Sequence, residues 1–326
     1  MDLHEALKLR FRRLSTAKKL LKEGADVNLK NSELDTPLHV AVHKKNFTFA
    51  KLLLDYGANV NQKNAKDQMP LHIASRRGSI LMMKLLINNN ADINAHGEYN
   101  ETPLLSALID RQLKAVKVLL KKGVEIDREM IIGWKAIHVA VYQNNFIALQ
   151  ELLKYGANLD ATLSSTGSTP LMIAITQGHS KMIDKLIELG AKIDKSSFTN
   201  LGPLSRSVQE GMIKVARKLI QLGADLDRQE YHSGNAPLHM AVSDGYDEIA
   251  RLLIENGACV DVKNKNLRTP LHVASENGRF EIIQDLLRFD ACSTTKDAFG
   301  YDPMEYALKK KSEIITKVIL FKRHSY

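Results

Sequence analysis

The sequence predicts an all-α fold, an elongated solenoid of stacked helix–turn–helix units joined by turn-rich loops. Two series of short motifs predict it. The first series places its second residue at 37, 70, 103, 136, 170, 203, 237, 270 and 303, with the sequences TPLH, MPLH, TPLL, KAIH, TPLM, GPLS, APLH, TPLH and DPME. The second series runs in phase with it, from KEGADVN at 22–28 to ENGACVD at 255–261. Every step of the first series is 33 or 34 residues, and one helix pair of that size cannot bury its apolar faces alone, so neighbours must stack.

The first complete repeat explains the two expected helices. Thr36 opens residues 36–46, TPLHVAVHKKN, where its hydroxyl can cap a helix. Pro37 suits the first turn because that position has no intrahelical donor to lose. In residues 47–58, FTFAKLLLDYGA, apolar residues fall at helical spacing, and Gly57 supplies a left-handed C-terminal cap. Each unit should therefore hold two short helices and a turn-rich loop.

Of the motifs that depart from this chemistry, two lie in the central repeats. KAIH has Lys135 and Ala136 in place of threonine and proline, and LGPLS also lacks the hydroxyl. A missing cap costs about 1 kcal/mol, and a lysine at a helix start opposes the helix dipole. The fourth anchor is therefore a predicted weak point of the stack.

The TPLH and GADVN signatures, recurring in register, resemble ankyrin repeats, and the resemblance covers essentially the whole chain. It implies a single ankyrin-repeat domain over residues 1–326, with an N-terminal capping repeat at 1–34, eight internal repeats at 35–301 and a C-terminal capping repeat at 302–326. Each unit would have a finger, an inner helix facing a concave groove and an outer helix on the convex back. The charged terminal units fit polar caps. The family's usual role is protein recognition without catalysis.

Charge and composition limit the class of partner. The net charge of +9 comes from the ends, because residues 1–30 carry eight Lys/Arg against four Asp/Glu and residues 309–326 carry six against one. A nucleic-acid binder would have a basic stripe along its contact surface, so a nucleic-acid partner is not expected. No run approaches a membrane span, and the N-terminus lacks the apolar block of a signal peptide. These features predict a monomer in the cytoplasm or the nucleus.

The repeated polar residues do not predict catalysis, a cofactor or a metal. One repeat position holds His39, His72, His138, His239 and His272. Stacked helices lie about 8–10 Å apart, whereas zinc ligands must lie about 2 Å from one ion, so these histidines are expected to be structural and hydrogen-bonded within their own repeat. Cys259 and Cys292 are expected to be free thiols, since their Cα atoms should exceed the disulfide limit of about 7 Å. No nucleophile–base pair lies outside the repeat, so an enzyme is not expected.

The finger before the fourth anchor predicts the partner-binding site. Most fingers are polar, but this one carries Ile131, Ile132 and Trp134, the only tryptophan. Clustered apolar and aromatic residues in a surface loop are typical of an interface. The alternative is that these side chains fold back onto adjacent fingers. Further candidates extend the site on neighbouring fingers and on the inner helix of the same unit: Tyr99, Phe198, Leu201, Tyr142 and Gln143.

A charged rim is expected beside this site. His43, Lys44, Arg76 and Arg77 fall at the ends of the first inner helices, whereas Glu210, Asp244 and Glu276 fall at later ones. A partner with an apolar centre and an acidic end over the first repeats would fit this order. The alternative is that these charges only form a solvated face.

Asn28, Asn61 and Asn94 resemble the position that asparaginyl hydroxylases modify in some ankyrin proteins. The alternative is that each loop asparagine satisfies backbone groups.

The sequence thus predicts an intracellular protein–protein interaction module, a scaffold, adaptor or inhibitor that binds a partner protein through its fingers and concave face. Two alternatives stay open: a host-directed effector or toxin-like ankyrin protein, and a peripheral membrane adaptor that uses the basic segment 7–22, LKLRFRRLSTAKKLLK. The sequence does not identify the partner or the process.

Overall fold

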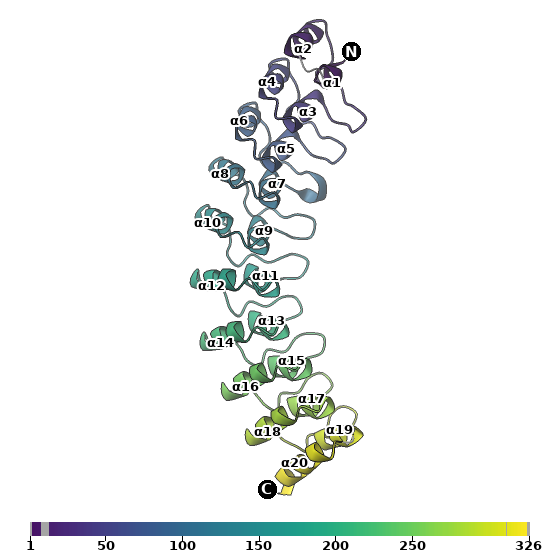
Figure 1. The fold of residues 1–326 in the computed structure, drawn as a ribbon, viewed down its shortest axis with the longest axis vertical. Helices are drawn as coiled ribbons and strands as arrows, with labels where there is room; N and C mark the ends of the chain where they lie inside the picture. Colours follow the sequence, from purple (N-terminus) through teal and green to yellow (C-terminus); the bar gives the residue numbers. More distant parts are fainter. Residues whose placement is uncertain (1, 8–12, 311, 325–326) are drawn as a thin grey trace. The chain divides into compact units, whose positions relative to one another are not determined.

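The computed structural model describes residues 2–7, 13–310 and 312–324, and over these residues the chain is helical with no strand. The chain forms two compact units, residues 1–165 and 166–326. Within each unit the inner helices lie between the outer helices and the finger loops (Figure 1). This arrangement confirms the predicted all-α repeat fold, whereas the expectation of one domain over the whole chain stays a prediction.

The first unit contains ten helices in its described residues and a short 3-10 turn, η1, at Glu98–Asn100. These helices are α1 (Leu3–Ala6), α2 (Arg13–Lys22), α3 (Pro37–His43), α4 (Phe47–Asp55), α5 (Pro70–Arg76), α6 (Ile80–Asn88), α7 (Pro103–Ile109), α8 (Leu113–Lys121), α9 (Ala136–Tyr142) and α10 (Phe146–Lys154).

The second unit continues the alternation of inner and outer helices over its described residues. Its helices are α11 (Pro170–Thr176), α12 (Ser180–Glu188), α13 (Pro203–Gln209), α14 (Ile213–Gln221), α15 (Pro237–Asp244), α16 (Asp247–Glu255), α17 (Pro270–Asn277), α18 (Phe280–Arg288), α19 (Pro303–Lys309) and α20 (Glu313–His324).

The predicted helix signals are present in the first complete repeat. Helix α3 begins at Pro37, and the Thr36 hydroxyl accepts from the His39 backbone N–H at 3.4 Å. Gly57 follows α4 with a φ of +82°, as a left-handed cap requires. At the fourth anchor, Lys135 makes no side-chain cap, as expected, and its ammonium group instead pairs with Glu129 at 3.2 Å.

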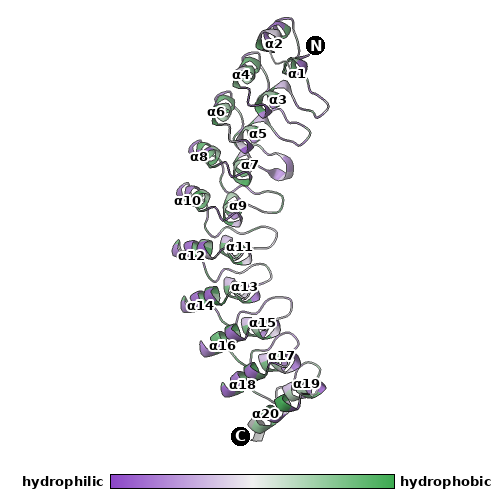
Figure 2. Cartoon of the chain, in the orientation of Figure 1, coloured by the Kyte–Doolittle hydropathy of each residue, from purple (hydrophilic) through white to green (hydrophobic). Residues whose placement is uncertain are grey.

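The core of each unit is a repeated leucine position on the outer helices. Inner helices pack on inner helices and outer helices on outer helices, for example α5 on α7 and α6 on α8. Figure 2 shows hydrophobic and hydrophilic residues alternating within the helices, as one-sided burial requires. Burial of each leucine side chain contributes about 1.5–3 kcal/mol. The fully buried members are Leu53, Leu86, Leu119 and Leu152 in the first unit and Leu186, Leu219, Leu253 and Leu286 in the second.

The repeated histidines are structural, and they connect neighbouring repeats. His138 is buried; its Nδ1 accepts from the Lys135 backbone N–H at 3.1 Å, and its Nε2 donates to the Ala161 carbonyl of the next repeat at 3.0 Å. His239 does the same with Ala236 at 3.2 Å and Arg268 at 2.9 Å. The expected bond within the repeat is therefore present, and a second bond to the following repeat accompanies it. Only the neutral ring with its proton on Nε2 makes both bonds.

The fingers are joined by one backbone hydrogen bond at a time. In the first unit Ala65 N donates to Glu33 O at 3.2 Å, Glu98 N to Lys66 O at 3.1 Å and Ile131 N to Tyr99 O at 3.0 Å. In the second unit Phe198 N donates to Thr166 O at 2.9 Å, Tyr231 N to Thr199 O at 2.7 Å and Lys265 N to Ser233 O at 2.9 Å. We call this series the finger ladder.

The described part of the last repeat exposes apolar side chains as well as charges, and its role as a cap stays a prediction. Leu308, Ile314, Leu320 and Phe321 are exposed by 53%, 65%, 36% and 78%. Val242 and Ser275, which precede Leu308 at the same repeat position, are buried because a further repeat covers them. Lys309, Lys310 and Lys317 therefore belong to a repeat that also exposes apolar side chains. None of the helices in the described part of the chain combines the length and apolar content needed to cross a bilayer.

Acidification should destabilise the fold through the buried histidines. Burial lowers the pKa of His138 and of His239 to about 4, whereas an unfolded histidine titrates near its ordinary value of about 6.5. The unfolded chain therefore takes up more protons between these values, so the histidine contribution is complete above about pH 6.5 and is lost as pH falls toward 4. Each histidine should lose up to about 3 kcal/mol. The check is urea denaturation followed by circular dichroism at pH 7 and pH 5.

His138→Leu is the matched variant, because Leu105 occupies the same repeat position. It should lower stability at pH 7 and weaken the dependence on pH. An unfolding midpoint that is equal at pH 7 and pH 5 in the wild type would contradict the role assigned to the neutral rings.

Candidate functional site

Two adjacent fingers of the first unit present exposed apolar side chains. Ile131 is 68% exposed, Ile132 56% and Tyr99 62%. The ladder bond from Ile131 N to Tyr99 O joins the two fingers. We call these three residues the finger patch. The structure therefore leaves the two predicted isoleucines and Tyr99 in solvent and does not fold them back into a core.

The backbone holds the finger patch in place. Tyr99 lies in η1 with a left-handed φ of 56°, and the next residue, Asn100, donates from Nδ2 to the Glu129 carbonyl at 2.7 Å. In the following finger Gly133 has a φ of +78°, and a Cβ there would meet Ser164 N at 2.4 Å. Only glycine fits that position, because the loop carrying the isoleucines lies directly against the Ser164 backbone.

Trp134 was predicted to be part of the binding anchor at the finger tip, but the structure does not place it there. Its side chain is half-buried, and its ring packs edge-to-face on Tyr142, with centroids 5.3 Å apart, and near His138 at 6.3 Å. Tyr142 remains 49% exposed. The predicted closeness of Trp134 and Tyr142 is therefore correct, but the tryptophan connects the finger to the inner helix and leaves the tip to the isoleucines.

Gln143, at the end of α9, is held by the preceding repeat. Its Nε2 donates to the Ile109 carbonyl at 2.9 Å, and its own carbonyl accepts from Arg111 Nη2 at 3.0 Å. The Gln143 side chain, which was expected to contact a partner, therefore hydrogen-bonds to the last residue of α7.

The remaining predicted apolar residues lie in the second unit. Phe198 is 66% exposed, and its ring lies over Gly167 of the preceding finger, where a Cβ would approach the ring to 2.8 Å. Leu201 is only 9% exposed, so it packs inside its unit and offers no surface to a partner. Tyr231, which the sequence reasoning missed, is 66% exposed at the ladder position of its finger. The extra residue in EYHSGN shifts Tyr231 out of the register used to compare fingers.

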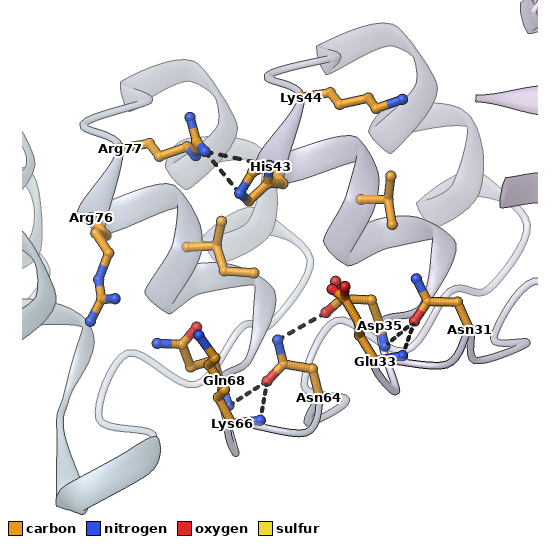
Figure 3. Close-up of a pocket in the computed structure, with 12 residues that line it drawn as sticks. Asn31, Glu33, Asp35, His43, Lys44, Asn64, Lys66, Gln68, Arg76 and Arg77 are labelled. Atoms are coloured by element: carbon orange, nitrogen blue, oxygen red, sulfur yellow. Dashed lines mark hydrogen bonds between the residues drawn. The ribbon is translucent and has the colours of Figure 1, made fainter. Parts of the chain in front are cut away.

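A groove lies between the first two fingers and the inner helices α3 and α5 (Figure 3). Its hollow measures about 430 Å³. We call it the N-terminal groove. It contains all four residues of the predicted charged rim, and its lining is completed by Val40, Ile73, Asn31, Asn64, Glu33, Asp35, Lys66 and Gln68.

The four residues of the rim are not equivalent. Arg76 Nη2 lies 2.8 Å from Glu101 Oε2, and Arg76 Nε lies 3.3 Å from Asp110 Oδ2, so this guanidinium is already paired. Arg77 donates from Nη2 to His43 Nε2 at 2.8 Å, and Lys44 Nζ donates to the Leu7 carbonyl at 3.4 Å. Lys44 and Arg77 are both exposed. Within the described residues no carboxylate pairs with either of them.

A family model described as ankyrin repeats in three copies matches residues 3–97, 58–130, 125–197 and 204–297. The chain belongs to the ankyrin repeat family. The solved structures that match include the ankyrin repeat domain of Bcl-3, described as a unique member of the IkappaB protein family, with 27% identity and a TM-score of 0.59. That alignment covers 67% of this chain and 98% of the Bcl-3 domain. A comparison with curated proteins found no match.

The loop asparagines of this ankyrin repeat chain form inter-repeat bonds. Asn28 Oδ1 accepts from Asn59 N at 2.8 Å, Asn61 Oδ1 from Asp92 N at 2.9 Å and Asn94 Oδ1 from Glu125 N at 2.8 Å. Aspartates take over in the second unit, where Asp227 accepts from Cys259 N and Asp261 from Cys292 N, both at 2.9 Å. The structural role expected of these asparagines is therefore present, and their modification stays a prediction.

The structure also locates the residues considered for metal binding, for a disulfide and for membrane contact. Among the described residues no group of three or more His, Cys, Asp or Glu is positioned to hold a metal ion. Cys259 and Cys292 are exposed free thiols, and hydrogen bonds from Thr294 lower the pKa of Cys292. Of the basic segment 7–22 proposed for membrane contact, residues 8–12 lie outside the described residues.

The Trp134–Tyr142 contact predicts a fluorescence response. In Tyr142→Ala the ring of Trp134 loses its edge-to-face neighbour, so its emission should shift to longer wavelength and acrylamide should quench it more strongly. Stability should fall by about 1 kcal/mol. Since the chain has one tryptophan, the signal reports this contact alone. Tyr56→Ala, on the outer-helix side of the same unit, should leave the emission unchanged; an equal response in both variants would contradict the contact.

Proposed function

We propose that this ankyrin repeat chain is an intracellular interaction module, a scaffold, adaptor or inhibitor, that binds a protein partner through the finger patch and without catalysis. The observation that carries the proposal is the exposure of Ile131, Ile132 and Tyr99 together on two joined fingers. Clustered apolar residues on a soluble surface are typical of interfaces, and aromatic residues are enriched there. The partner proposed is a protein and not a nucleic acid, and the site of action is the cytoplasm or the nucleus.

Preformed geometry favours affinity at this patch. The ladder bond and the bond from Asn100 to the Glu129 carbonyl already hold both fingers, so little ordering is required on binding. Full burial of each isoleucine side chain by a partner would contribute about 1.5–3 kcal/mol. The half-exposed Tyr142, supported by Trp134, offers a second contact on the inner-helix side of the same finger.

The test compares two pairs of substitutions in an affinity capture from cell lysate, read by quantitative mass spectrometry. Ile131→Ser with Ile132→Ser should reduce recovery of a direct partner, and the purified partner should bind at least about tenfold more weakly. The control pair is Leu81→Ser with Ile147→Ser, which changes two side chains of the outer helices α6 and α10 that are 70% and 54% exposed. The control removes as much exposed apolar surface away from the fingers.

Both variants are first checked for unchanged helicity and melting. Retention of the same partners by the finger variant, or equal loss in both variants, would contradict binding at the finger patch. Loss of fold in the finger variant would assign the isoleucines to packing. In that case a photo-crosslinking residue in place of Tyr99, compared with one in place of Ile147, decides whether a partner touches the patch.

A further inference from the structure

We propose that the N-terminal groove binds an extended peptide that places a carboxylate side chain between Lys44 and Arg77. The inference deepens the proposed function, because it names the chemistry of a segment that a protein partner would carry. It concerns a surface separate from the finger patch, so each can fail without the other.

The cationic side of the groove has two charges available. Lys44 and Arg77 follow the inner helices α3 and α5 of adjacent repeats, and both line the same hollow. The Lys44 ammonium donates to the Leu7 carbonyl at 3.4 Å and points away from Arg77 (Figure 3), so it must exchange that bond for one to the ligand. Arg77 Nη2 contacts His43 at 2.8 Å to Nε2 and 3.4 Å to Nδ1, which positions the guanidinium, and the three donors on Nε and Nη1 remain for a ligand. A carboxylate is the group that a guanidinium fork and an ammonium recognise best in a peptide.

The neighbouring cations do not compete for the same ligand. Arg76 is occupied by Glu101, which is itself buried, and by Asp110. Arg111, at the corresponding end of α7, donates to the Gln143 carbonyl at 3.0 Å. At the inner-helix ends that line the groove, the positive charge without a carboxylate partner therefore lies on Lys44 and Arg77, which favours an acidic residue of the ligand at this side.

The opposite side of the groove selects a peptide over a polyanion. This side carries two acids against one base, with Glu33 and Asp35 on the first finger and Lys66 on the second. Asp35 Oδ1 accepts from Asn64 Nδ2 at 2.9 Å (Figure 3). A nucleic acid or an anionic lipid surface would bring negative charge to both sides at once, and like charges at an interface are costly. A peptide can place an acidic side chain at one side and a basic or polar one at the other.

The floor and size of the groove also suit a peptide. Val40 and Ile73 supply apolar contact between the two charged sides. The side-chain amide of Gln68 makes no hydrogen bond to the described residues, so it can pair with a peptide backbone. A hollow of about 430 Å³ lies within the range of about 300–1,000 Å³ that is usual for ligand sites and holds a few residues of extended chain.

The test is selection from a phage-displayed library of random 12-residue peptides on the purified full chain. The wild type should enrich peptides with Asp or Glu at one position. A selected peptide, labelled with fluorescein, should bind the Lys44→Glu, Arg77→Glu variant at least about tenfold more weakly by fluorescence anisotropy. Selection on this charge-reversed variant should lose the acidic preference.

Three controls make the outcome specific. Lys51→Glu with Lys84→Glu makes the same charge change on exposed lysines of the outer helices α4 and α6 of the same repeats, and it should leave peptide affinity within about twofold because surface charges far from the groove are screened. Lys44→Gln with Arg77→Gln replaces the reversal if that variant fails to fold. The Ile131→Ser, Ile132→Ser variant should bind the peptide like the wild type.

Three results would overturn the groove assignment: no acidic preference, equal affinity of the wild type and the groove variant, or displacement of the peptide by a single-stranded oligonucleotide or by phosphatidylserine vesicles. If the finger variant still loses its protein partner in that case, the proposed function holds and only the groove proposal fails. If the peptide is selected as expected but the finger variant keeps every partner, recognition belongs to the groove and the finger proposal fails.

Discussion

The fold depends on a buried neutral imidazole that bonds in two directions. At His138 the backbone N–H at the start of α9 occupies Nδ1, which places the ring proton on Nε2, and that proton reaches a carbonyl of the next repeat. One side chain thus fixes its own helix start and the position of its neighbour. Because the ring is buried, an unmade bond on either nitrogen would carry the full cost of desolvation. Local and inter-repeat order are therefore coupled through the same few atoms.

Two repeats without this histidine separate the two tasks. At the same position Leu105 N donates to the Thr102 hydroxyl and Met172 N to the Thr169 hydroxyl, both at 3.3 Å. The helix start is capped there, but the polar bond through the inner helix to the next repeat is absent. The loop residue Asn94 still bonds Glu125 N in the following repeat. The ankyrin stack thus has two kinds of polar link, and losing one does not remove the other.

The sequence predicts the fold well because each signal is local and recurs. Thr36, Pro37 and Gly57 act within a few residues of themselves, and a 33-residue period repeats their effect. The site was predicted less well because its properties depend on neighbours from other repeats. Trp134 is half-buried through Tyr142, and Arg76 is neutralised by Glu101 and Asp110. Comparing fingers by the number of residues before each motif cannot reveal these contacts. The same comparison also missed Tyr231, which falls outside the positions compared.

The finger ladder has a consequence for how such a chain changes over generations. Its bonds join backbone atoms only, so the identity of the side chain at each rung does not affect them. The rungs of this chain accordingly hold a small residue at Ala65, an acid at Glu98, an aliphatic residue at Ile131, an aromatic at Phe198 and a base at Lys265. Single-codon substitutions at a rung can alter what the surface recognises while leaving foldability intact. If the fingers bind as proposed, the specificity of binding can therefore change one finger at a time, through sequences that all fold.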